Sequence, residues 1–227
     1  MTQNDDQRRR LFCVLRRITV PPWDKWLFDP SKNREVKTEE LPKYKVIYAD
    51  PPWHYRVWSK KGDGRSAEAH YPTMNMEDIK KLPIAQITDR DAALFLWVTF
   101  PLLQEAWSVM KAWGFTYKSV AFVWIKQNRK SDALFWGMGY WTRANAEICL
   151  LATRGHPKRV ARNVHQVIFS HIEEHSKKPD EARRRIEQLM GDVPRIELFA
   201  RRTSPGWDVW GNEVQSDISF VQSPNNF

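Results

Sequence analysis

The sequence predicts a doubly wound α/β domain, in which a mostly parallel β-sheet carries helices on both faces. Apolar runs of strand length alternate along the chain with segments whose apolar residues recur at helical spacing, and this alternation is typical of strand–helix–strand units. The chain has 227 residues, of which 42% are hydrophobic and 28% charged. These values fit one globular domain with a complete core. The sequence contains no GxGxxG motif, which disfavours a dinucleotide-binding version of the fold.

Each expected element has a local signal. Residues 45–49 are rich in β-branched and aromatic side chains and predict a buried central strand. In residues 101–113 apolar side chains recur at helical spacing and Gly114 supplies a stop, which predicts an amphipathic helix. Pro179 and the acids after it predict the start of another helix. We also expect strands at residues 92–98, 117–126, 147–153, 166–170 and 196–199, a short helix at 76–82, and a solvated helix face at Arg183, Arg184 and Arg185.

The chain divides into three expected parts. Residues 1–44 mix charges, prolines and tryptophans without a steady period, and they predict an N-terminal extension that partly packs on the domain. Residues 45–213 hold all the expected strands and helices. Residues 214–227 predict a polar C-terminal tail.

The charge balance favours a polyanionic partner. Lysine and arginine number 36 against 27 aspartates and glutamates, which gives a formal net charge of +9. Such a surface attracts nucleic acid. Many soluble proteins are basic for other reasons, so charge alone leaves nucleic acid at even odds.

Cysteine, histidine and hydropathy patterns argue against several other classes. Cys13 and Cys149 lie far apart without CxxC spacing, which disfavours a zinc site and a disulfide framework and favours a reducing, cytoplasmic setting. His171 and His175 lack the glutamate in the position that a helical zinc-hydrolase motif needs. No apolar run reaches the roughly 18 residues of a membrane span. We therefore expect no metal and no membrane partner.

The stretch Asp50-Pro51-Pro52-Trp53 has the most specific chemistry in the chain. The two prolines must end the preceding strand, so the acid lies at a strand's carboxyl end, where α/β sheets bind ligands. An exocyclic amine on a nucleobase is a poor nucleophile until acceptors hold its N–H bonds, and Asp50 and the Pro51 carbonyl can be those acceptors. Asp50 is expected to be ionised at neutral pH. Trp53 can stack on the base, a contact worth roughly 1–3 kcal/mol.

A plain structural turn is the alternative for this stretch. Asp-Pro-Pro is a common turn sequence between secondary-structure elements. The chain also contains Val20-Pro21-Pro22-Trp23, which has the same Pro-Pro-Trp without the acid, and we assign that copy no chemistry.

Several further motifs occur in a fixed order. Together with the Asp50 stretch, which resembles motif IV of S-adenosylmethionine-dependent amino-methyltransferases, they resemble the MT-A70 family of adenine methyltransferases over about three quarters of the chain. The matching segments are Tyr71-Pro72-Thr73-Met74, Leu94–Thr99, Val123–Lys126, Glu147–Leu150, Ser176–Glu181, Ile196–Phe199 and Gly211-Asn212. The resemblance implies a Rossmann-like S-adenosylmethionine-dependent methyltransferase fold over residues 45–213, with a circularly permuted motif order.

The resemblance also implies a function and a set of site residues. The function is methyl transfer from S-adenosylmethionine to the exocyclic amino nitrogen of adenine in DNA. The catalytic residues would be Asp50, Pro51, Pro52 and Trp53. Those at the substrate would be Tyr71, Glu147, Ser176 and Lys178. Those at the methyl donor would be Asp50, Lys178, Glu197, Leu198, Arg201 and Asn212.

Two alternatives to this function remain open from the sequence. One is an RNA adenine methyltransferase; DNA ranks first because the solitary form resembles bacterial and phage enzymes. The other is a non-catalytic nucleic-acid-binding homologue, because the chain departs from the family pattern at Ala200, where relatives have glycine, and at Thr203-Ser204, where they often have His-Asn. Relatives commonly pair, which leaves a homodimer open.

Overall fold

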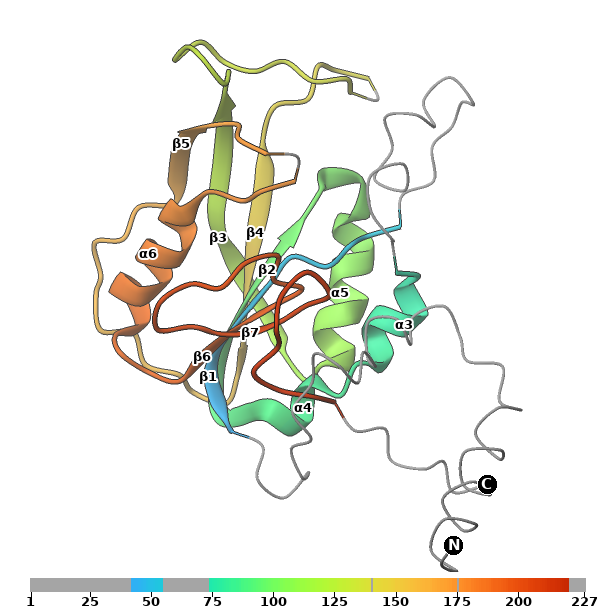
Figure 1. Ribbon diagram of the computed structural model, residues 1–227, viewed down its shortest axis with the longest axis vertical. Coiled ribbons are helices and arrows are strands. Elements are labelled where there is room, and N and C mark those ends of the chain that lie inside the picture. The colour runs from blue at the N-terminus through green and yellow to red at the C-terminus, as the bar shows by residue number, and fades with distance from the viewer. Residues whose placement is uncertain (1–41, 55–73, 140, 175, 221–227) are drawn as a thin grey trace, which may run out of the picture.

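The computed structural model describes residues 42–54, 74–139, 141–174 and 176–220. The expected extension therefore lies outside the described residues except for its last three positions, and so does Tyr71. Within the described part, the chain forms one seven-stranded sheet with helices packed against it (Figure 1). The predicted α/β class is confirmed.

The strand order in the sheet is β5-β3-β4-β2-β1-β6-β7. Strand β4 runs antiparallel to both of its neighbours, and every other neighbouring pair is parallel. The sheet is therefore mixed but mostly parallel. The strands are β1 (Tyr44–Ala49), β2 (Thr88–Val98), β3 (Thr116–Gln127), β4 (Glu147–Arg154), β5 (Val167–His171), β6 (Arg195–Leu198) and β7 (Asp208–Trp210).

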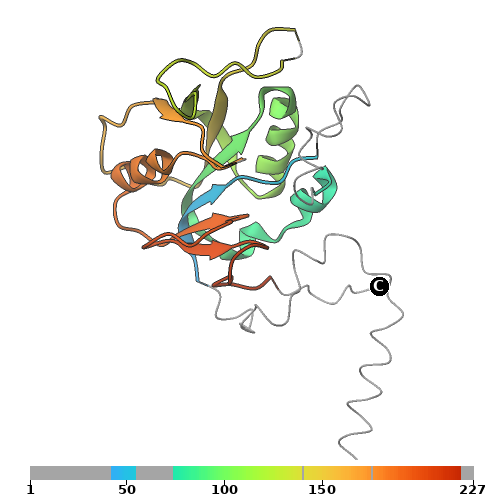
Figure 2. The same ribbon diagram turned by 45° about the horizontal axis from the view of Figure 1, so that its top comes forward.

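Helices cover both faces of the sheet, and Figure 2 shows α6 on one side with α3 and α5 on the other. The helical segments are α3 (Met76–Lys81), α4 (Ile84–Ile87), the 3₁₀ turn η5 (Phe100–Leu102), α5 (Leu103–Ala112) and α6 (Asp180–Met190). The helix expected from residue 101 thus begins with a 3₁₀ turn. Among the described residues, no helix is both long and apolar enough to cross a membrane.

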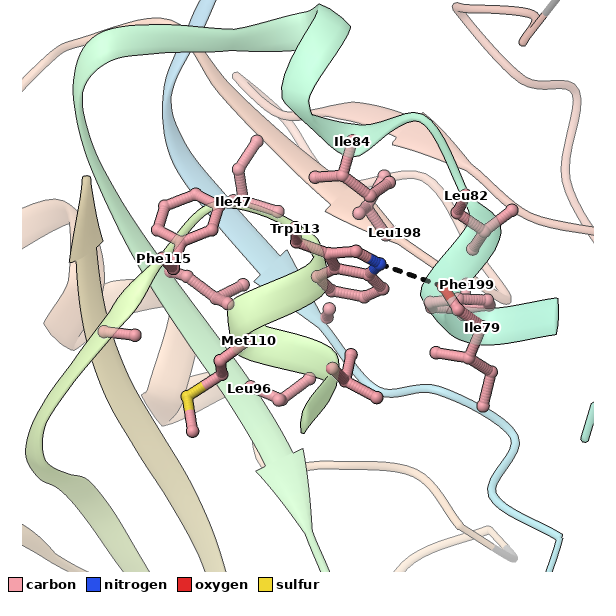
Figure 3. Close-up of a cluster of buried hydrophobic side chains, with 14 of the residues drawn as sticks. Ile47, Ile79, Leu82, Ile84, Leu96, Met110, Trp113, Phe115, Leu198 and Phe199 are labelled. Atoms are coloured by element: carbon pink, nitrogen blue, oxygen red, sulfur yellow. Dashed lines mark hydrogen bonds between the residues drawn. The ribbon is translucent and has the colours of Figure 1, made fainter. Parts of the chain in front are cut away.

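The alternation of side chains along β1 builds two cores. Ile47 and Ala49 join the cluster under α3 and α5, whereas Val46 and Tyr48 join the cluster under α6. Figure 3 shows the first cluster around the fully buried Trp113, whose Nε1 donates to the carbonyl of Ile79 at 2.9 Å. Because both faces of β1 are covered, its sequence is a nearly continuous apolar run.

The expectation of a polar tail from residue 214 is wrong for its first half. Val214, Ile218 and Phe220 are buried, and the Phe220 ring lies 5.0 Å from that of Trp210. Hydrogen bonds also hold this segment to β7, since Asp217 N–H donates to the Val209 carbonyl at 2.9 Å and Val209 N–H donates to Asp217 Oδ2 at 2.8 Å. The average polarity of the segment did not reveal these partners.

The sheet topology brings the chemistry to one edge. All strands except β4 run in the same direction, so their carboxyl ends share an edge, and β4 begins at that edge with Glu147. Asp50 directly follows β1. The ends of β6 and β7 lie next to it through the register of Ala49 with Leu198 and of Leu198 with Trp210. This is the edge at which ligands bind in α/β sheets.

Candidate active site

The backbone of the Asp50 loop is fixed by hydrogen bonds. The N–H of Trp53 donates to the Pro51 carbonyl at 2.8 Å, and the N–H of Met74 donates to the Pro52 carbonyl at 3.0 Å. The Trp53 indole donates to the carbonyl of Trp97, at the end of β2, at 3.0 Å. The loop is therefore held between β2 and the start of the chain that leads into α3.

One expectation about this loop needs correction. Trp53 is only 7% exposed and belongs to the core cluster under α3 and α5, so its ring anchors the loop, which argues against stacking on a base. The Pro51 carbonyl, which was expected to be an acceptor for the amine, accepts from the Trp53 N–H. A carbonyl oxygen can accept two hydrogen bonds, so this contact alone does not saturate it.

The Asp50 carboxylate is paired with Lys178, which lies just before α6. Lys178 Nζ is 2.7 Å from Asp50 Oδ2, 3.3 Å from Glu147 Oε2 and 3.3 Å from the Ser176 carbonyl. An ammonium has three N–H donors, so each donor has an acceptor. The Lys178 side chain is 9% exposed, whereas Asp50 keeps 27% exposure and remains accessible from the sheet edge.

A second lysine completes the network. Lys126, at the end of β3, lies 2.5 Å from Glu147 Oε1 through its Nζ atom. Glu147 therefore binds one lysine with each oxygen. The result is a chain of alternating charges that joins β3, β4, the α6 loop and β1: Lys126, Glu147, Lys178 and Asp50.

Burial and pairing set the protonation of these groups. Burial raises the pKa of Asp50 above its ordinary value, and Lys178 opposes this only in part. Burial would also raise the pKa of Glu147, but Lys178 and Lys126 together outweigh it and lower that pKa to about 2. Burial lowers the pKa of Lys178, yet the two carboxylates raise it overall. The sequence had placed Asp50 at an ordinary pKa because its burial was not visible there.

The backbone before α6 is strained at the site. Ser176 has φ of 65°, and Phe199, directly after β6, has φ of 61°. Non-glycine residues seldom adopt this region, and strain of this kind gathers at functional sites. In Ser176 the strained backbone presents its carbonyl to Lys178.

Glu197 on β6 is held by an arginine that the sequence analysis had expected to be solvated. Arg183 donates from Nε and Nη2 to both oxygens of Glu197, each at 2.7 Å, and is 9% exposed. Burial raises the pKa of Glu197, and Arg183 opposes that rise. The expectation of a solvated face is therefore wrong for Arg183 and for Arg185, whose side chain is 18% exposed, while Arg184 is 74% exposed. Three consecutive arginines do not reveal which one meets a carboxylate on another element.

The segment after β6 packs tightly against the end of β7. Ala200 N–H donates to the Trp210 carbonyl at 3.0 Å, and a Cβ on Gly211 would lie 2.0 Å from the Ala200 carbonyl oxygen. The Ala200 side chain itself is fully buried against Val209 and Val214. The fold thus accommodates alanine where relatives have glycine, and it requires glycine at Gly211.

The structure brings most of the predicted site residues to one edge. Asp50, Glu147, Ser176 and Lys178 meet directly. The charge of Arg201 lowers the pKa of Asp50, and the charge of Asp50 raises that of Glu197. Leu198 is buried beneath them, and Arg201 also pairs with Glu213 at 2.9 Å, next to Asn212. The roles assigned to these residues stay predictions.

Two residues of the site had been given no role from the sequence. Lys126 fell within a matching motif but was not assigned, and Arg183 was placed on the surface. What identifies Lys126 and Arg183 as site residues is a carboxylate on an adjacent element, Glu147 for Lys126 and Glu197 for Arg183. The sequence does not show these pairs, because only the fold brings the partners close. No group of three or more histidine, cysteine, aspartate or glutamate side chains suited to a metal ion occurs among the residues that the structure describes.

Comparison with known proteins identifies the family. The MT-A70 family model matches residues 44–213. The type II methyltransferase M.MunI of Mycoplasma sp is 35% identical over 189 residues, which cover 76% of this chain and 78% of that protein. The N(6)-adenosine-methyltransferase catalytic subunit METTL3 of Homo sapiens is 30% identical over 186 residues, 80% of this chain, and its Danio rerio relative is 31% identical over 185 residues. The chain spans only 30% of each of these two METTL3 proteins. Since the family model covers most of the chain, the protein belongs to the MT-A70 family of methyltransferases.

Proposed function

We propose that this protein transfers a methyl group from S-adenosylmethionine to the exocyclic amino nitrogen of adenine in DNA. The observation that carries the proposal is the partly exposed carboxylate of Asp50, fixed at the carboxyl edge of the sheet by prolines on one side and by Lys178 on the other.

The residues at the edge fit the donor molecule. S-adenosylmethionine supplies an activated methyl group on a sulfonium. Its carboxylate suits the ammonium of Lys178, and its ribose hydroxyls suit the free lone pairs of Glu197 and the amide of Asn212. Gly211 keeps the backbone of this region free of a side chain that would collide with Ala200. The two hydrogen bonds that Arg183 donates to Glu197 orient that carboxylate and oppose the rise in its pKa that burial causes.

The protein's own residues would activate the amine by accepting hydrogen bonds. Asp50 takes one N–H and the remaining lone pair of the Pro51 carbonyl takes the other, which favours a pyramidal, nucleophilic nitrogen. Holding base and donor in this arrangement, about 3–3.5 Å apart, is the main source of acceleration. Asp50 is also the nearest base for the proton that the nitrogen loses after transfer. A duplex target would have to be flipped out of the stack.

DNA ranks above RNA as the polymer because this chain matches a bacterial type II methyltransferase more completely than it matches the N(6)-adenosine-methyltransferases. The similarity to M.MunI, which favours DNA, spans most of both chains. The similarity to proteins named N(6)-adenosine-methyltransferases, which favours RNA, spans a third or less of their length. RNA methylation remains the second candidate.

The test is methyl transfer to matched polymers. The protein is incubated with tritiated S-adenosylmethionine and with DNA or RNA of the same sequence, and the nucleosides are separated after digestion. Label in N6-methyladenine from DNA is expected. Label mainly in RNA would move the assignment to the second candidate. No label in either, together with no heat of S-adenosylmethionine binding, would favour a non-catalytic homologue.

A further inference from the structure

The segment between β3 and β4 exposes several large apolar side chains. The exposed fractions are 94% for Trp141, 76% for Met138 and 61% for Trp136. Figure 1 shows this segment at the top of the molecule, beyond the end of β3. Large apolar side chains gathered on one exposed segment mark a surface that binds a partner.

The same segment is basic. Arg129, Lys130 and Arg143 are exposed, against one acid, Asp132. Arg143 lies over the tip, with its Nη1 atom 3.7 Å from Sδ of Met138. A partner that is both aromatic and anionic complements this mixture of indoles and guanidinium groups better than a second copy of a chain whose own net charge is +9.

The base of the segment is tied down. The Asn145 side chain accepts from the Lys126 N–H at 2.9 Å and donates to the Lys126 carbonyl at 2.9 Å and to the Phe135 carbonyl at 2.5 Å. Gly137 N–H donates to the Ala144 carbonyl at 2.7 Å. The backbone on either side of Trp136 is therefore held by hydrogen bonds, and beyond Trp141 the chain is held again at Ala144 and Asn145. Such preorganisation lowers the entropic cost of binding.

The hydrogen bonds of Asn145 also connect the segment between β3 and β4 to the candidate active site. Lys126, whose backbone Asn145 holds, reaches Glu147 through its side chain, and Glu147 reaches Lys178 and so Asp50. The segment that carries the exposed indoles is thus connected through Asn145 and Lys126 to the edge that carries the carboxylate.

We propose that Trp136 and Trp141 form a stacking platform for bases that flank the target nucleotide, with Arg143 and Lys130 at the adjoining phosphates. This inference rests on the proposed function, since it names the surface that holds the polymer. Every base offers a face for stacking, so the platform holds single-stranded or flipped-out segments with little regard to sequence.

The test measures binding without turnover. Affinity for a fluorescein-labelled single-stranded DNA oligonucleotide is followed by anisotropy in the absence of methyl donor. Trp136→Ala and Trp141→Ala are each expected to bind roughly 5- to 150-fold more weakly, and the double variant Trp136→Ala/Trp141→Ala more weakly than either. Trp136→Phe/Trp141→Phe retains most of the affinity. Arg143→Gln should reduce the slope of log affinity against log salt by about 0.7.

Trp107 provides a matched control. It is 43% exposed on α5 and packs on Tyr117 at the start of β3, near the opposite end of that strand. Trp107→Ala should leave oligonucleotide affinity unchanged. Unchanged affinity in the double alanine variant, an equal loss in Trp107→Ala, or no binding by the unaltered protein would overturn the proposal.

Two further outcomes separate this proposal from others. If sedimentation shows that the double alanine variant loses a dimer while each chain keeps its oligonucleotide affinity, the surface binds a second copy and the platform is wrong. If the protein binds through the indoles but transfers no methyl group, the platform stands and the proposed reaction falls.

Discussion

Lys178 Nζ lies 2.7 Å from Asp50 Oδ2, and this contact joins the loop before α6 to the end of β1. It neutralises a carboxylate whose burial otherwise favours the protonated form. Because the same ammonium also contacts Glu147 and the Ser176 carbonyl, a donor carboxylate that binds Lys178 must replace one of three existing acceptors. If the methyl donor binds Lys178 as we propose, the lysine would couple donor binding to the protonation state of Asp50.

Replacing this lysine tests the coupling. In Lys178→Met the pKa of Asp50 should rise further, and a protonated acid accepts hydrogen bonds from an amine poorly. We expect kcat/KM to fall roughly 10²-fold or more, with weaker binding of S-adenosylmethionine in a calorimetric titration. The neighbouring Lys177, which pairs with Glu173 on the surface, supplies the control, and Lys177→Met should behave as the unaltered protein does. Equal effects in both variants would contradict the coupling.

Lys126 should hold the pKa of Glu147 low. Glu147 has a pKa of about 2 because Lys178 and Lys126 outweigh its burial. In Lys126→Met one of these charges is lost, so the pKa of Glu147 should rise, as an NMR titration of its side-chain carboxyl would show. Lys126→Arg keeps the charge and should keep the pKa of Glu147 low. An unchanged Glu147 titration in Lys126→Met would contradict this role of Lys126.

Arg183 should be essential for stability. Arg183→Ala leaves Glu197 buried without its counter-charge, and breaking a buried pair in this way costs about 3–5 kcal/mol. Arg184→Ala, one position along at 74% exposure, should change the free energy of unfolding by less than about 0.5 kcal/mol. Urea denaturation of both variants measures these changes in the free energy of unfolding. A small effect for Arg183→Ala would show that Glu197 finds water or another partner.

Gly211 should tolerate no side chain. A Cβ there would lie 2.0 Å from the Ala200 carbonyl oxygen, so Gly211→Ala must displace backbone beside β7. At Gly114, by contrast, φ is 82° and a Cβ would have open space, so Gly114→Ala should cost only about 1–2 kcal/mol of backbone strain. The melting temperature should fall more for Gly211→Ala. The opposite order would place the close contact in doubt.

The fold was largely predictable because most of its strands are apolar runs bounded by turn residues. The strands from β1 to β6 were expected from such runs, and the direction of β4 was not, because side-chain periodicity does not encode whether a strand runs parallel to its neighbour. β7 has three residues, too few for a periodic signal. The burial of Phe220 escaped prediction for the related reason that its partner, Trp210, lies on another element.

The site was predictable where a residue type carries its own chemistry. Asp50 stands out because prolines follow it at the end of a strand, and Lys178 because it precedes a helix start. The roles of Arg183 and Trp53 were predicted wrongly because the surroundings of these side chains decide their roles. Arg183 is buried and donates to Glu197, and the Trp53 indole donates to the Trp97 carbonyl. Tyr71 stays a prediction outside the described residues.

The central claim is that the Asp50 carboxylate activates the amine, and Asp50→Ala tests it most directly. The variant should keep its cooperative thermal unfolding, since the removed group is partly exposed and Lys178 retains Glu147. Transfer of tritiated methyl from S-adenosylmethionine to adenine in DNA should fall roughly 10²–10³-fold or below detection, while Asp192→Ala, at a surface acid with 99% exposure, stays active. Full transfer by a folded Asp50→Ala protein would contradict the account.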